Sequence, residues 1–179
     1  MTTKPARIPW SVPVRRDDVP ESGLHLDVTA DEAARAAIAT LAGVSGLPRL
    51  AASFGIARQG KGLRVEGEVT AAVEQTCVVT LEPMTSEIHE PIDLVFMPAA
   101  GSAPAGETRE EIDPAAADDP EPLVAGVADL GAAATEFLLL AIDPYPRKPE
   151  AVFDSPDQAD TGTHPFAALA ALKKQPKES

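Results

Sequence analysis

The sequence contains one cysteine, Cys77, among its 179 residues. A single cysteine excludes an intramolecular disulfide, and it cannot form a structural zinc site without further Cys or His ligands. No run of about 18 apolar residues exists, so no segment is expected to span a membrane. Aromatic residues make up only 4% of the chain, so the core must consist mainly of Ala, Val, Leu and Ile.

The motifs of several common enzyme classes are missing as well. The chain has no P-loop, no dinucleotide-binding glycine pattern, no HExxH and no GxSxG. Its three histidines, at positions 25, 89 and 164, lack the spacing of metal ligands. Many carboxylates fall in a Pro- and Ala-rich segment that should not hold a pair for acid–base catalysis. We therefore expect no enzyme activity, no metal and no cofactor.

Negative charge is abundant, with 28 Asp and Glu against 15 Lys and Arg and a net charge of -13. An acidic protein repels phosphate backbones, so DNA binding is not expected and RNA contact would need a local basic patch. The charge instead suits a basic protein partner. The N-terminal residues lack the apolar core of a secretion signal, and a cytoplasmic location is the expectation.

Period-two alternation of apolar residues predicts an α+β fold with a mostly antiparallel sheet of about five or six strands. Two helices are expected to pack on this sheet, one capped by Thr29 and one capped by Asp129. Prolines limit the first alternating stretch to an edge strand or an extended arm. The expected strands lie near residues 8–14, 24–28, 50–56, 63–73 and 88–96, with a further short strand within residues 121–130.

Composition divides the chain into an ordered part and two irregular segments. Residues 100–120 are rich in Ala, Pro, Asp and Glu, which predicts a disordered acidic loop. Residues 151–179 should form a flexible tail that could include a short helix, since Phe166, Leu169 and Leu172 recur at helical spacing. Residues 1–150 are expected to form a single domain around the acidic loop.

Cys77 continues the odd-numbered apolar positions that run from Leu63 to Val73. This phase predicts a small buried side chain, as is common for a free cysteine. The neighbouring sequence offers neither a basic residue nor a helix N-terminus that would activate a thiol. A cysteine-dependent enzyme that uses Cys77 as a nucleophile remains an alternative.

Two short segments combine an aromatic residue with cations. An aromatic face can stack on a base, and Arg or Lys can contact phosphate or carboxylate groups. The first segment is RIPWSVPVRR near the N-terminus, and the second is DPYPRK at residues 143–148. DPYPRK could equally be a rigid helix stop with exposed polar residues. The candidate partner- or RNA-binding residues are Trp10, Arg15, Arg16, Tyr145, Arg147 and Lys148.

The turn CVVTLEP and the block from Asp129-Leu130-Gly131 to DPYPR resemble the YceD family, the large ribosomal RNA subunit accumulation proteins. The resemblance covers about residues 8 to 150 and is closest to alphaproteobacterial members. Many members carry Cys-x-x-Cys in this turn, whereas this chain has Thr80 at the second position, so a metal role is not carried over. The residues that mark the family are Cys77, Leu81, Glu82 and Pro83.

The resemblance implies a non-enzymatic role in ribosome biogenesis that supports accumulation of large-subunit (23S) ribosomal RNA. The expected partner is the large-subunit precursor, contacted through a basic ribosomal protein or through the RNA itself. The net charge favours the protein partner. An acidic scaffold unrelated to ribosomes is the remaining alternative.

Overall fold

The computed structural model describes residues 8–98 and 120–153. The predicted acidic loop and tail lie largely outside these ranges, as does the predicted helix near Phe166. The elements, in chain order, are β1 (Pro13–Arg15), the short 3-10 helix η1 (Arg16–Asp18), β2 (Leu24–Thr29), α1 (Glu32–Ala42), β3 (Gly46–Gln59), β4 (Gly62–Thr76), β5 (Pro83–Pro98), β6 (Glu121–Leu123), β7 (Val127–Asp129) and α2 (Leu130–Ala141).

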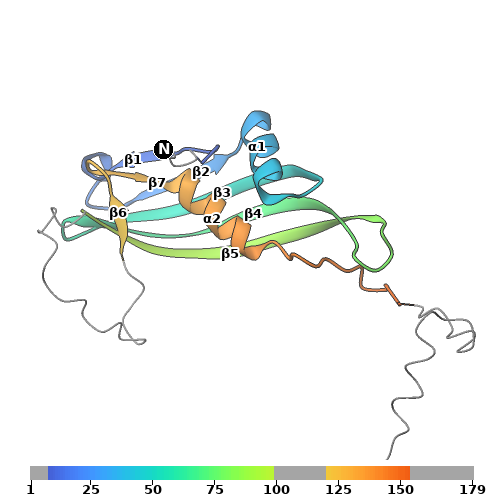
Figure 1. Cartoon of the computed structure of the whole chain (residues 1–179). Coiled ribbons are helices and arrows are strands. Elements are labelled where there is room, and N and C mark those ends of the chain that lie inside the picture. Colours follow the sequence, from blue (N-terminus) through green and yellow to red (C-terminus); the bar gives the residue numbers. More distant parts are fainter. Residues whose placement is uncertain (1–7, 99–119, 154–179) are drawn as a thin grey trace, which may run out of the picture.

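Five strands form the main sheet in the order β2-β3-β4-β5-β6 (Figure 1). The first four strands pair antiparallel: β3-β4 and β4-β5 form hairpins, whereas α1 lies in the connection between β2 and β3. The short edge strand β6 runs parallel to β5. This confirms the predicted α+β fold with a mostly antiparallel sheet. A second sheet, which the sequence did not predict, pairs β1 with β7.

The two helices lie on the same face of the main sheet, with α1 packed over β3 and α2 over β4 and β5 (Figure 1). Alternate strand residues point into this layer, as the apolar phase of β4 predicted. Most of the core is aliphatic, as the low aromatic content required. The largest fully buried side chains include Ile38, Leu50, Phe54, Ile56, Leu63, Val65, Val69, Val73, Leu130 and Leu138.

The start of α1 differs from the prediction. Thr29 is the last residue of β2 and pairs with Ala51, so it does not cap the helix. The cap is Asp31, whose carboxylate accepts a hydrogen bond from the backbone N–H of Ala34 at 2.7 Å. The predicted cap of α2 is confirmed, because the Asp129 carboxylate accepts from the N–H of Ala132 at 3.1 Å.

The N-terminal segment was predicted to be an edge strand or an extended arm over residues 8–14. Only Pro13–Arg15 is a strand, and it pairs with β7 in the second sheet. Trp10 lies in the core with 6% of its surface exposed, and its backbone passes close to α2. A Cβ at Gly131 would lie 2.9 Å from the Trp10 carbonyl oxygen, so glycine permits this close approach.

Candidate functional site

The family-marking turn and the DPYPRK segment meet at one end of the molecule. The N–H of Val78 donates to the carbonyl of Pro146 at 2.9 Å, and the side chain of Gln75 donates to the carbonyl of Asp143 at 2.8 Å. We call residues 77–83 and 143–148 together the turn end. Two sequence features more than 60 residues apart therefore form one surface, which periodicity alone could not show.

Cys77 is fully buried at the centre of the turn end, which confirms the predicted burial. Its Sγ accepts hydrogen bonds from the backbone N–H of Lys148 at 3.4 Å and of Thr80 at 3.5 Å. The Thr80 side chain and then these N–H groups lower the pKa of the Cys77 thiol to about 6, against the opposing effect of burial. The prediction considered only basic residues and helix N-termini in the neighbouring sequence. The structure adds the Thr80 side chain within the turn and the N–H of Lys148 from a distant part of the chain.

Lys148 and Glu82 pair across the same junction, with 2.6 Å between Nζ and Oε2. Their hydrogen bond lowers the pKa of the Glu82 carboxyl and raises the pKa of the Lys148 ammonium group. The Lys148 ammonium group is therefore already paired with Glu82 within the protein. Tyr145, which is 71% exposed, and Arg147 point outward and remain accessible, together with Leu81 at the tip of the turn.

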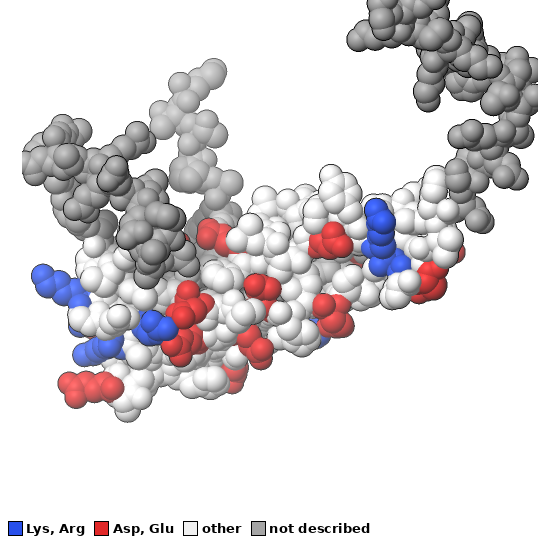
Figure 2. Space-filling view, turned by 90° about the horizontal axis from the view of Figure 1, so that it is seen from below, with Lys and Arg blue, Asp and Glu red and all other residues white. Residues whose placement is uncertain are grey.

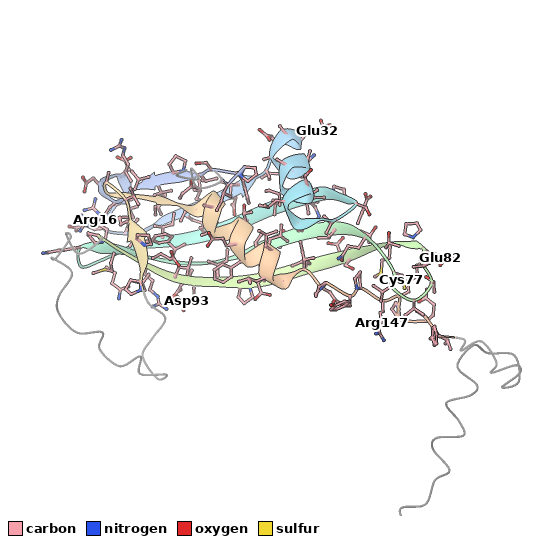
Figure 3. All side chains as sticks on the ribbon, in the orientation of Figure 1. Arg16, Glu32, Cys77, Glu82, Asp93 and Arg147 are labelled. Carbon is pink, nitrogen blue, oxygen red and sulfur yellow. The ribbon has the colours of Figure 1, made fainter. Side chains whose placement is uncertain are left out.

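The N-terminal candidate residues lie elsewhere. Figure 3 shows Arg16 at one end of the sheet and Arg147 at the other, with Cys77 and Glu82 close to Arg147. Trp10 is buried and offers no free stacking face, and the Arg16 guanidinium donates to the Gly60 carbonyl at 2.8 Å. The six predicted residues therefore do not form a single site.

Sequence reasoning expected an acidic protein to bind a basic partner but did not locate the surface. The structure gathers carboxylates on the sheet face turned away from the helices. We call this surface the open face. It lies on β2 to β5, and Figure 2 shows more acidic than basic side chains on the side of the molecule opposite α1. The charged side chains of the open face are Asp27, Arg49, Arg64, Glu66, Glu68, Glu74, Glu87 and Asp93.

Both arginines of the open face are already paired. Arg49 binds Glu87 across β4, and Arg64 contacts Glu66 at 2.6 Å and Asp93 at 2.9 Å. The hydrogen bond with Glu66 is the main cause of the raised pKa of Arg64. The net charge of the face is therefore negative. The alternation of Arg64, Glu66 and Glu68 in the sequence was the signal that could have revealed it.

Small side chains line the middle of the open face. Ala51, Ser53, Gly55 and Ala57 follow one another along β3, and shallow hollows lie beside them, bordered by acidic residues of β2 and β4. Within residues 8–98 and 120–153, no group of three or more His, Cys, Asp or Glu lies close enough to hold a metal ion. Neither helix in these ranges is long and apolar enough to cross a membrane.

Comparison with protein families identifies the chain. The profile described as "Large ribosomal RNA subunit accumulation protein YceD" matches residues 65–173, which is more than half of the sequence. The chain belongs to the YceD family. The match begins in β4 and includes the whole turn end. No curated protein and no solved structure matches the chain significantly.

The YceD description names a factor for accumulation of ribosomal RNA of the large subunit, and it names no enzymatic reaction. This links the protein to the large ribosomal subunit. The YceD match extends to residue 173 and so includes the terminal segment PFAALAALK, whose sequence also resembles this family. The match leaves out β2, α1 and β3.

Proposed function

We propose that this protein is a non-enzymatic assembly factor that acts in the cytoplasm and binds a basic protein of the large ribosomal subunit through its open face. One observation carries the proposal: carboxylates of β2, β4 and β5 share this face, and both of its arginines are neutralised by ion pairs within it. Complementary charge steers a basic partner to such a surface and rejects bare RNA.

The shape of the face supports the same partner. Long Lys and Arg side chains pack their apolar stems on small residues and place their charged ends beside carboxylates. The stripe from Ala51 to Ala57 provides that floor, and Asp27 and Glu68 border one of its hollows. The open face would therefore cover a basic surface of its partner.

The Cys77 enzyme alternative has less support. A nucleophilic thiol must reach its substrate, and Cys77 is fully buried beneath the turn. The hydrogen bonds from Lys148 and Thr80 occupy the sulfur and join two chain segments. We propose a structural role for this thiol.

The proposal is tested by co-sedimentation of the full chain with large-subunit precursor particles and by mass spectrometry of the captured proteins. Reversal of open-face charge with Glu66→Lys and Glu68→Lys should weaken capture of basic ribosomal proteins at least roughly tenfold. The matched control, Glu21→Lys and Glu32→Lys, makes the same change in net charge at exposed positions outside the open face and should bind like the wild type.

Equal loss in both variants would show that only net charge matters, and unchanged binding of the open-face variant would refute the proposal. RNA contact at the turn end is the rival. In that case Tyr145→Ala with Arg147→Gln should abolish capture, while the open-face variant should still bind.

A further inference from the structure

A groove lies between α2 and the β5–β6 edge of the main sheet, away from both the turn end and the centre of the open face. Its volume is about 370 Å³. It adjoins β6, the strand at the edge of the main sheet. The residues that line it are Pro13, Leu94, Phe96, Glu121, Pro122, Val124, Val127, Asp129, Ala132, Ala133, Glu136 and Phe137.

Most of the groove wall is apolar, and part of it is open to solvent. Val124 is 68% exposed, and Phe137 is half-buried beside it in the groove lining. Exposed apolar surface of this kind is typical of a binding site when polar groups lie at defined points along it. The groove therefore has the character of a docking surface.

Carboxylates are the only charged groups in the groove lining. Asp129 is already occupied, because it accepts hydrogen bonds from Ser11, the N–H of Val12 and the N–H of Ala132. Glu121 and Glu136 take part in no ion pair within the described part of the chain. Partial burial, followed by the negative charge of Glu121, raises the pKa of the Glu136 carboxyl. A cation between the two carboxylates would relieve both effects.

We propose that this groove binds an arginine side chain flanked by apolar residues, presented by a segment of a basic partner protein. Arginine fits because its planar guanidinium can contact two carboxylates and stack on an aromatic ring, while the flanking residues cover the apolar wall. The inference rests on the proposed function for the origin of the partner. It deepens that function, because the groove supplies specificity that the open face lacks.

The test uses the isotope-labelled full chain and a capped pentapeptide, Val-Leu-Arg-Leu-Val, followed by NMR. The amide signals of Val124, Glu136 and Phe137 should shift on titration. The same peptide with citrulline in place of arginine keeps its shape but loses its charge and should bind at least roughly tenfold more weakly. Peptide binding should also lower the pKa of the Glu136 carboxyl.

Variants localise the effect. Glu136→Gln should weaken peptide binding roughly tenfold, while the control Glu87→Gln, on the open face, should leave it unchanged. Equal binding of the arginine and citrulline peptides would overturn the inference. A second result would also overturn the inference. If the amide signal of Phe137 shifts without peptide when Lys173 and Lys174 are replaced by glutamine, the groove holds the chain's own C-terminal segment. If the protein dimerises as its concentration rises and Glu136→Gln abolishes this dimerisation, the groove binds a second copy of the chain and not a partner protein.

The inference and the proposed function fail separately. If the peptide binds and no large-subunit protein is captured, the groove stands and the proposed function falls. If large-subunit proteins are captured equally by the wild type and by Glu121→Gln with Glu136→Gln, the proposed function stands and the groove does not take part in it.

Discussion

At the scale of single residues, Cys77 shows how a buried side chain acquires a particular chemistry from its tertiary neighbours. The sulfur accepts hydrogen bonds from two segments of chain, and these lower its pKa to about 6. Thr80, three residues after Cys77 in the turn, is the first cause of the shift. The thiolate thereby helps to hold the DPYPRK segment against the turn.

The lowered pKa predicts a stability effect with a definite pH dependence. Between about pH 6 and 9 the folded thiol is ionised while the unfolded thiol, with its ordinary pKa of 9.0, is protonated. Stability linked to Cys77 is therefore fully present above pH 9 and is lost as the pH falls through 6. The urea midpoint of the wild type minus that of Cys77→Ala should increase across this interval. A constant difference would show that the folded thiol is neutral.

The Thr80→Ala variant provides the control for this experiment. Because Thr80 supplies the largest stabilisation of the thiolate, its removal should raise the pKa of Cys77, as followed by thiolate absorbance. The pH interval of the stability difference should become narrower by the same shift. An unchanged thiol pKa would contradict the assigned cause.

At the scale of secondary structure, the pairing of β3 with β4 depends on a glycine. Gly67 faces Phe54 in the register, and a Cβ at Gly67 would lie 2.0 Å from the Ser53 carbonyl oxygen. No side chain fits between the strands there without a backbone shift. The glycine thus allows the close contact of the two strands at the centre of the sheet.

Gly67→Ala should therefore destabilise the fold by about 3 kcal/mol, near the upper end of the cost of overpacking. Gly55→Ala is the matched control in the neighbouring strand, because its Cβ would have its nearest contact at 3.6 Å, from the Glu66 carbonyl. That variant should change stability by less than about 1 kcal/mol. Chemical denaturation of both proteins decides the point, and similar midpoints for the two variants would show that the strands adjust freely.

At the scale of the whole molecule, charge and shape are distributed unevenly. The net charge is -13, and part of it lies on the open face on one side of the sheet. Exposed Tyr145 and Arg147 lie at the turn end. The groove is a third surface beside β6. A large basic partner could contact the open face and the groove together by covering the edge strand.

This arrangement predicts a strong salt dependence of partner binding. Capture of large-subunit proteins should fall as ionic strength rises from about 0.05 to 0.3 M, because added salt shortens the distance, about 10 Å at 0.1 M, beyond which exposed charges are largely screened from one another. The Glu66→Lys, Glu68→Lys variant should show a smaller dependence than the wild type, and the Glu21→Lys, Glu32→Lys control should retain it. Equal slopes in all three proteins would place the electrostatic contacts outside the open face.

The sequence by itself determined the fold class, the main strands, the burial of Cys77 and the cap at Asp129, because alternation and local capping act over a few residues. It also carried the family, through the turn and the DPYPRK block. Only the tertiary structure decided which distant segments meet: Lys148 at the Cys77 sulfur, β1 beside β7, and Glu121 near Glu136 in one groove. It also buried Trp10 and separated the two groups of candidate residues. The physical reason is that these contacts form between segments distant in the sequence, and no local pattern records them.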